Sequence, residues 1–242
     1  MKLSRLQLIS KYLFQRVYTR ANKGQLNFLS KSLSKGSVFF DVGSNFGIFT
    51  FWAAFYMRKG GEIYLFEPQD ELNVYYKFIA KLFPKVKIHI SNFGLSSSSG
   101  TLKLSRNYIG DGGASLQKRK HTKFSGTLSK NINLISLDEF INSIKINKIT
   151  LIKVDIERHE YDFVIGALST LSKFKPNILI ELDIDSKTCQ KIISSLEEMG
   201  YQSRMLLENK LFISSDRKKI PHPKYGVNGL RDFLFYTSTR IS

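Results

Sequence analysis

The apolar residues from about position 37 onward follow two alternating patterns. Short apolar runs at Ser37–Val42, Glu62–Phe66 and Val86–Ile90 have the length of buried strands. Between them, as through residues 72–82, apolar side chains recur three and four positions apart, like one face of a helix. The same alternation predicts two later strands, at Ile149–Val154 and Ile178–Leu182. Each is followed by a predicted helix, at Glu160–Leu171 and Asp185–Met199. This rhythm requires crossover connections and predicts an α/β fold, a Rossmann-like, doubly wound, mostly parallel sheet.

The last quarter of the chain has a different pattern. Met205–Leu207 and Leu211–Ile213 flank a short polar turn and predict a hairpin, and Phe233–Tyr236 predicts a final strand. An antiparallel C-terminal edge is a common ending for a parallel sheet. Residues 106–132 are polar, and we expect a long loop there, of the kind that forms a lid or a substrate-binding loop.

The first 36 residues differ again, and we divide the chain into a basic N-terminal helical extension (1–36) and a Rossmann-like domain (37–242). Leu3, Leu6 and Leu13 share one face of a helical wheel, with basic residues on an adjacent face. A shorter helix is expected around Gln25–Leu33. The extension can cover the hydrophobic core with its charges in water, or lie on an anionic membrane surface.

Length and cysteine content narrow the class of protein. A chain of 242 residues suits one substantial α/β domain. The single cysteine, Cys189, excludes an intramolecular disulfide, a cysteine-built zinc site and a CxxC redox pair. No apolar run is long enough to span a membrane, and polar residues interrupt any signal-peptide core. We expect a cytoplasmic protein that can lie peripherally at a membrane face.

The net charge is +17, and it is unevenly distributed. Residues 1–40 contain eight basic side chains and no acidic one, and further basic clusters lie at 118–123 and 217–219. Such a field attracts nucleic acid, an anionic membrane face or acidic glycans. The alternative is that the lysines are solvated surface with no polyanionic partner.

A glycine loop follows the first predicted strand, in the sequence Asp41–Val–Gly–Ser–Asn–Phe–Gly47. Gly43 and Gly47 would let the backbone approach a ligand closely where the next helix begins. The spacing differs from the G-x-G-x-x-G of pyrophosphate binding, so it suits a nucleoside with a compact charged tail. Asp41 can bind an ammonium group directly or through water.

Glu67 ends the next predicted strand, about 20 residues past this loop. A carboxylate there can accept hydrogen bonds from both ribose hydroxyls. A ribose joined to a charged amino-acid tail, without pyrophosphate, indicates S-adenosylmethionine as the cofactor.

Acidic and imidazole side chains follow the strand that ends at Val154. Asp155, Glu157 and His159 alternate, and on an extended backbone they would project to one side. His159 is the expected base for removing a hydroxyl proton, and a carboxylate can orient it or bind the hydroxyl. Asp155 and Glu157 can also hold a divalent cation, although a metal requirement stays open.

The chain resembles the FkbM-type methyltransferases, S-adenosylmethionine-dependent O-methyltransferases that often act on sugars and on polyketide or glycan products. The resemblance covers about residues 38–183. It is carried by Asp41–Gly47, Phe66–Pro68, Asn92–Ser96 with Gly100, Gly113–Leu116, Ile135–Asp138, Ile152–Glu157 with Glu160, and Gly166–Ala167.

The resemblance implies a class I methyltransferase fold and a set of cofactor-binding positions. Asp41, Gly43, Asn45 and Gly47 match the cofactor loop, and Glu67 matches the ribose ligand. Asn92 and Phe93 lie where the adenine is expected. Two positions depart from the family pattern: Arg158 stands where glycine is usual, and Gly94 stands where alanine is common.

We therefore expect a methyltransferase that modifies a hydroxyl of a carbohydrate, a glycolipid or a related small product. Two alternatives remain: an RNA 2′-O-methyltransferase, suggested by the charge, and a non-catalytic Rossmann-fold binding module. Nucleic acid is the less favoured partner, because no N/D-P-P-[YFW] sequence is present to hold an amino nitrogen.

Overall fold

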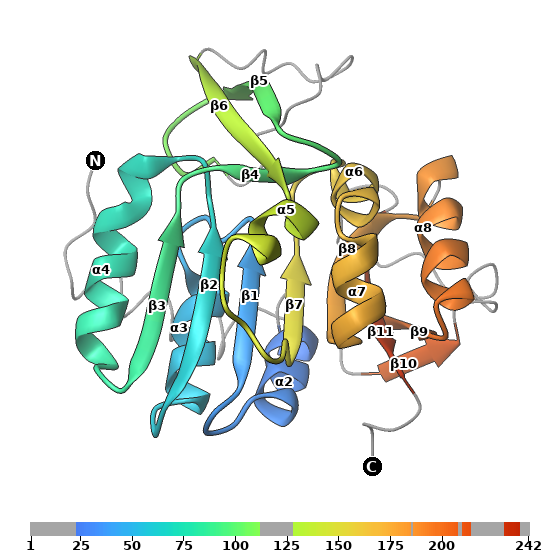
Figure 1. Cartoon of the computed structure of the whole chain (residues 1–242), viewed down its shortest axis with the longest axis horizontal. Helices are drawn as coiled ribbons and strands as arrows, with labels where there is room; N and C mark the ends of the chain where they lie inside the picture. Colours follow the sequence, from blue (N-terminus) through green and yellow to red (C-terminus); the bar gives the residue numbers. More distant parts are fainter. Residues whose placement is uncertain (1–22, 112–127, 185, 208–209, 214–229, 238–242) are drawn as a thin grey trace.

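The computed structural model describes residues 23–111, 128–184, 186–207, 210–213 and 230–237, and their core is an eight-stranded sheet in the order β10-β9-β11-β8-β7-β1-β2-β3 (Figure 1). The five strands from β8 to β3 are parallel, and β9, β10 and β11 form an antiparallel edge. Their bounds are β1 (Val38–Val42), β2 (Gly61–Phe66), β3 (Val86–Ser91), β7 (Leu151–Val154), β8 (Asn177–Asp183), β9 (Gln202–Leu207), β10 (Lys210–Ile213) and β11 (Leu230–Tyr236). The predicted α/β fold with an antiparallel C-terminal edge is confirmed.

Helices cover both faces of this sheet. Their bounds are α2 (Lys23–Ser32), α3 (Ile48–Tyr56), η1 (Asp70–Leu72), α4 (Asn73–Leu82), α5 (Leu137–Asn142), α6 (Glu160–Ile165), α7 (Leu168–Phe174) and α8 (Lys187–Glu198). Phe39 on β1 belongs to the core cluster beneath α2, α3 and α4, and Phe40 belongs to the cluster on the other face. Both faces of β1 are therefore buried, which is why this strand reads as a continuous apolar run.

The helix predicted over Glu160–Leu171 is wrong, because the structure divides it into α6 and α7 at Gly166. A Cβ at Gly166 would lie 2.0 Å from the carbonyl oxygen of Ser96, so β4 passes too close for a side chain. A new helix then begins, and the Asp138 carboxylate accepts the backbone N–H groups of Ser169 (3.0 Å) and Thr170 (2.7 Å). Local periodicity could not reveal that contact.

The polar segment 106–132 is also not a loop throughout, because a strand begins at Leu128. A three-stranded sheet lies at the carboxyl ends of the parallel strands, in the order β4-β6-β5 (Figure 1). Its strands are β4 (Gly94–Ser96), β5 (Gly100–Arg106) and β6 (Leu128–Ser136). Leu104, Ile132 and Leu134 form a small buried cluster of their own. Residues 112–127, which contain the basic cluster at 118–123 and most of the predicted lid, lie outside the described residues.

The short helix expected around Gln25–Leu33 is confirmed as α2. Leu26, Leu29 and Leu33 are buried in the same cluster as α3, and Gln25 donates a side-chain hydrogen bond to Asp232 on β11. The described part of the basic segment is thus packed in the core, whereas residues 1–22 lie outside the described residues. The division of the chain at residue 36 stays a prediction. Among the helices that the structure describes, none is long and apolar enough to cross a membrane.

Candidate functional site

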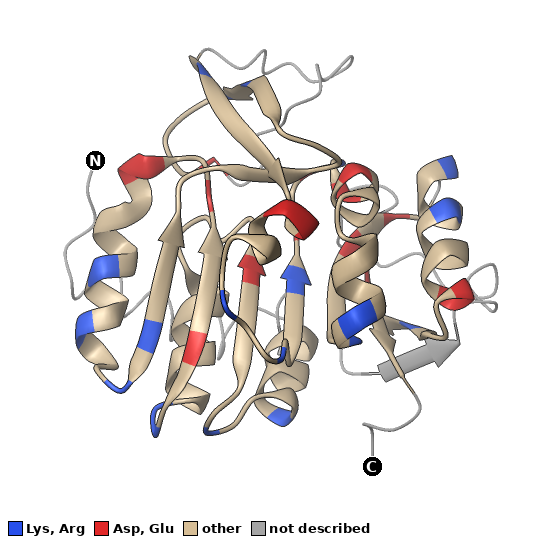
Figure 2. Ribbon diagram, viewed as in Figure 1, with Lys and Arg blue, Asp and Glu red and all other residues tan. Residues whose placement is uncertain are grey.

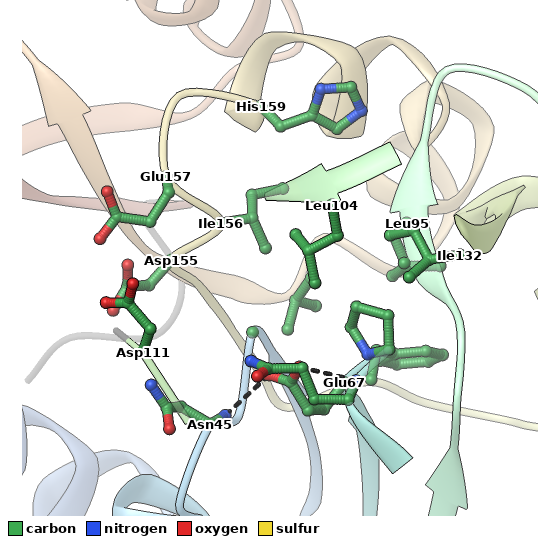
Figure 3. Close-up of a pocket in the computed structure, with 16 residues that line it drawn as sticks. Asn45, Glu67, Leu95, Leu104, Asp111, Ile132, Asp155, Ile156, Glu157 and His159 are labelled. Carbon is green, nitrogen blue, oxygen red and sulfur yellow. Dashed lines mark hydrogen bonds between the residues drawn. The ribbon is translucent and has the colours of Figure 1, made fainter. Parts of the chain in front are cut away.

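A cavity lies where the carboxyl ends of β1, β2 and β7 meet the three-stranded sheet (Figure 3). The chain continues from β1 to β2 on one side, and β7 joins β1 on the other, so this is the point where the strand order reverses. Doubly wound sheets bind their ligands in the crevice at that point. Leu95, Leu104 and Ile132 form the apolar end of the cavity, and the labelled carboxylates of Asp111, Asp155 and Glu157 lie at its other end.

The glycines of the first loop face other parts of the chain. Gly43 has φ +77°, and a Cβ there would lie 1.9 Å from the carbonyl oxygen of Asp155. Gly47 has φ +76°, and its Cβ would lie 2.9 Å from Ile79 of α4. The close approach that sequence analysis assigned to a ligand is therefore an approach between chain segments. Gly43 still lines the cavity, whereas Gly47 does not.

Glu67 lies at the tip of β2 and is 5% exposed. Its Oε2 accepts the backbone N–H of Asn45 (3.0 Å), and its Oε1 accepts that of Gln69 (3.0 Å). Burial raises the pKa of this carboxyl, and the two N–H groups oppose that rise. Each oxygen keeps a further lone pair, so the carboxylate can also accept two hydroxyl hydrogen bonds. Asn45 lines the cavity too, and its buried Oδ1 has no hydrogen-bond partner among the described residues.

Asp41 lies beneath the loop, fully buried, and does not line the cavity. Its Oδ2 accepts a hydrogen bond from the Thr50 hydroxyl (2.6 Å). Burial raises the pKa of Asp41, and the charge of Lys153 opposes that rise. Of the two contacts expected from the sequence, direct binding of a ligand's ammonium group by Asp41 does not fit this placement, and a contact through water stays a prediction.

Asp155, Glu157 and His159 all line the cavity, but the backbone that carries them is not extended. Glu157 has φ +54° and Arg158 has φ +76°, so both lie in the left-handed region. The Glu160 carboxylate stabilises this turn by accepting the N–H groups of Ile156 and Arg158, each at 3.2 Å. The positive φ at Arg158 is the conformation that favours glycine, the residue usual at this position in the resembled family.

Asp155 forms an ion pair with Lys153, whose Nζ lies 3.1 Å from Oδ2. Lys153 is buried between Asp155 and Asp41, and these two charges raise its pKa although burial opposes them. Its Nζ also lies 4.8 Å from the centre of the Phe49 ring. Lys153 therefore fixes the Asp155 side chain from below the cavity.

His159 is buried, and both of its ring nitrogens have neighbours. Nε2 lies 2.9 Å from the Ser96 hydroxyl, and Nδ1 lies 3.3 Å from Asp162. Burial lowers the pKa of His159, and the Asp162 carboxylate opposes that change. The ring is thus neutral at neutral pH, which is the form a base requires, but its Nε2 is already engaged.

Asn92 and Phe93 are not among the cavity-lining residues. Asn92 forms a pair of side-chain hydrogen bonds with Asn73 and donates to the carbonyl oxygen of Glu67 (3.2 Å). Phe93 packs against the ring of Phe66, with centroids 5.8 Å apart. In this structure both residues support the strand that carries Glu67.

Sequence reasoning missed Gln69 and Asp111, which also line the cavity. The buried Gln69 Oε1 accepts hydrogen bonds from Arg106 (2.8 Å) and from the backbone N–H of Gly110 (3.0 Å). Arg106 also pairs with Glu71 (2.6 Å) and lowers the pKa of that carboxyl to about 2. These bonds join the three-stranded sheet to the end of β2 and place Asp111 at the cavity. The position of Gln69 directly after Glu67–Pro68 could have indicated a residue at the cavity. Its hydrogen-bond partners could not be predicted, because they depend on the geometry of the loops.

The charges of the lining residues restrict what the cavity can bind. The described lining residues include four carboxylates and no Lys or Arg, so they favour hydroxyl and cationic groups over phosphates. Within the described part of the chain, no group of three or more His, Cys, Asp or Glu side chains is placed to hold a metal ion.

Comparisons with known proteins agree with this geometry. The model of the methyltransferase FkbM domain matches residues 41–203. A hexuronic acid methyltransferase of Haloferax volcanii, AglP, is 27% identical over 176 residues, which are 72% of this chain and 69% of that protein.

Two solved structures share the fold. Methyltransferase FkbM from Methylobacillus flagellatus has a TM-score of 0.52 and 15% identity, over 92% of this chain and 48% of the other, so this chain spans about half of that protein. SMU.1697c from Streptococcus mutans, solved in complex with S-adenosylhomocysteine (SAH), has a TM-score of 0.52 and 10% identity, over 91% and 99% of the two chains.

Proposed function

The chain belongs to the FkbM methyltransferase family, and we propose that it transfers a methyl group from S-adenosylmethionine to a hydroxyl oxygen of a carbohydrate or glycolipid. Family membership makes it an S-adenosylmethionine-dependent methyltransferase. The observation that carries the proposal is the pair of carboxylates Glu67 and Asp155 in one cavity, at the ends of the two strands that flank β1. The hexuronic acid methyltransferase supports a carbohydrate acceptor.

The cavity has the chemical groups that this cofactor needs. Glu67 would bind the ribose hydroxyls with its remaining lone pairs, and the unpartnered Oδ1 of Asn45 is a further polar contact. Leu95 and Leu104 offer apolar surface for the adenine, and the acidic end suits a cationic tail. When bound, the cofactor supplies a methyl sulfonium, which is a strong electrophile.

Asp155 is the residue that would orient the acceptor. Its carboxylate can accept a hydrogen bond from the attacking hydroxyl, and the Lys153 ion pair holds it in place. His159 is neutral, but because its Nε2 is bound to Ser96, we assign it a smaller part in proton removal. Holding the acceptor hydroxyl in line with the methyl group would then supply most of the rate acceleration.

The RNA alternative is less well supported by the described cavity, whose lining offers no cation for a phosphate. A non-catalytic binding module would not require Asp155 to be fixed by a buried lysine. A cytoplasmic location and a role for residues 1–22 at a membrane stay predictions from the sequence.

The test is the transfer of a radiolabelled methyl group to polysaccharide, glycolipid and RNA fractions of the same cells. We expect label in the carbohydrate-containing fractions. Asp155→Asn should lower turnover at least about tenfold and change cofactor affinity only a few fold, because the lost contact orients the acceptor. Asp70→Asn, which removes an exposed carboxylate outside the cavity, is the matched control. Label in RNA alone, or parental turnover in Asp155→Asn, would contradict the proposal.

A further inference from the structure

Charged side chains are segregated between the two edges of the parallel sheet (Figure 2). Acidic groups gather at the carboxyl edge, where the cavity lies, and basic groups gather at the opposite, amino edge. In this fold the amino ends of the parallel strands and the C-terminal ends of α3 and α4 meet at the amino edge. Within the described residues the amino edge is therefore mainly basic, although lysines also lie elsewhere, as on α8.

The amino edge contains a hollow of about 500 Å³ lined by five lysines. We call these residues the basic edge: Lys35, Lys85, Lys87, Lys145 and Lys148. Glu62 is the one acidic residue among the described lining, and it lies 4.0 Å from Lys87 and 3.1 Å from His89. The structure gives the other four lysines no ion pair with a described residue. Their charges are therefore available to an anionic partner.

Exposed apolar side chains lie at the same edge of the molecule. Phe55 is the penultimate residue of α3 and is 40% exposed, and Leu82 is the last residue of α4 and is also 40% exposed. The guanidinium of Arg58 lies 5.1 Å from the centre of the Phe55 ring. Cations beside exposed aromatic and aliphatic groups suit the boundary between lipid headgroups and acyl chains.

We propose that the basic edge docks on an anionic lipid bilayer. The lysines would contact lipid phosphates, and Phe55 and Leu82 would enter the headgroup region. A nucleic acid backbone has no apolar region that could bury Leu82, so a bilayer fits this surface better. The cavity lies at the opposite edge, so the polyanion that this surface binds is not the methyl acceptor. The proposal is independent of the reaction, because it rests on a surface remote from the cavity.

The test is co-sedimentation of the full chain with vesicles of phosphatidylcholine containing 30 mol% phosphatidylglycerol, against vesicles of phosphatidylcholine alone, at about 0.1 M salt. The triple variant Lys85→Glu, Lys145→Glu, Lys148→Glu should bind the anionic vesicles at least roughly 100-fold more weakly, because each lysine near such a surface contributes about fivefold and the introduced carboxylates add repulsion. The matched control reverses three exposed lysines away from the basic edge, Lys103, Lys187 and Lys191, and should bind nearly as well as the parent. Phe55→Ser with Leu82→Ser should also weaken vesicle binding, and poly(U) RNA serves as a competing polyanion.

Loss of vesicle binding in the basic-edge variant but not in the control supports the proposal. Equal losses in both triple variants would show a non-specific charge effect and overturn it. Binding of the parent to poly(U) with none to anionic vesicles, or vesicle binding unaffected by the basic-edge reversal, would overturn it as well.

Discussion

Gly43 is constrained by two separable effects, its positive φ and the carbonyl oxygen of Asp155 beside it. Gly36 has nearly the same φ, +79°, but a Cβ there would meet nothing within 4 Å. Gly36→Ala should therefore cost only the backbone strain, about 1 kcal/mol. Gly43→Ala should cost several kcal/mol and weaken cofactor binding, since a contact of 1.9 Å forces the two loops apart. Urea unfolding and cofactor titration of both variants measure the difference, and equal stabilities would show that the loop contact is misplaced.

His159 makes a prediction about pH. With an ordinary histidine pKa the rate of methyl transfer would rise through the neutral range. Burial lowers the pKa of His159 in the folded protein. A base acts in its neutral form, so activity should be flat from about pH 7 to 9 and fall only on the acid side of about pH 6.5. His159→Gln should reduce that acid-side fall, with the exposed His89→Gln as control. A parental rate that is already half of its plateau value at pH 6.5 or above would contradict the lowered pKa of His159.

Cavity residues that directly follow a strand could be predicted from the sequence better than cavity residues that loops place there. Glu67 and Asp155 directly follow apolar strands, and both line the cavity. Gln69 and Asp111 reach it through hydrogen bonds to Arg106, Gly110 and Asn107, and such partners leave no periodic signal in the sequence. The expected alternation from Asp155 to His159 failed because two residues there adopt positive φ.

Among the elements, α2 belongs to the core although its segment is basic. Leu29 of α2 is fully buried, so Leu29→Ala should lower the free energy of unfolding by about 2–5 kcal/mol. Leu102→Ala, at a position 43% exposed, should change it by less than about 1 kcal/mol. Removing residues 1–36 would strip α2 and yield an insoluble protein. A soluble, folded fragment 37–242, or a small effect of Leu29→Ala, would show that α2 is dispensable.

Elements with strong periodicity were predictable, and their interruptions were not. The central strands β1 and β7 matched their apolar runs because both of their faces are buried. The break between α6 and α7 and the strand β6 depend on tertiary contacts: the Ser96 carbonyl against Gly166, and Leu104 packed with Ile132. Polar residues at the start of β6 face solvent, so local composition resembled a loop.

Across the whole molecule, half-buried acids on one face of the sheet link stability to pH. Burial raises the pKa of Glu181 to about 8 and that of Asp232 to about 7. The folded state thus retains protons that the unfolded state has lost, and stability falls as pH rises from about 4.5 to 8. Glu181→Gln should raise the melting temperature by at least about 3 °C at pH 9 and change it little near pH 4, where the carboxyl is protonated in both states. The control Glu198→Gln, at an exposed position, should leave the melting temperature unchanged at both pH values. An unchanged melting temperature of Glu181→Gln at pH 9 would contradict the raised pKa of Glu181.

The most direct test of the central claim, that this cavity binds S-adenosylmethionine through Glu67, is calorimetric titration of the cofactor product S-adenosylhomocysteine. Glu67→Gln keeps the size of the side chain but replaces one acceptor oxygen with a donor. We expect its dissociation constant to rise at least about tenfold, because a charge-assisted hydrogen bond of roughly 1.5–3 kcal/mol is lost. Glu62→Gln makes the same change on the same strand at the opposite edge and should bind like the parent. Parental affinity in Glu67→Gln, or an equal loss in both variants, would contradict the account.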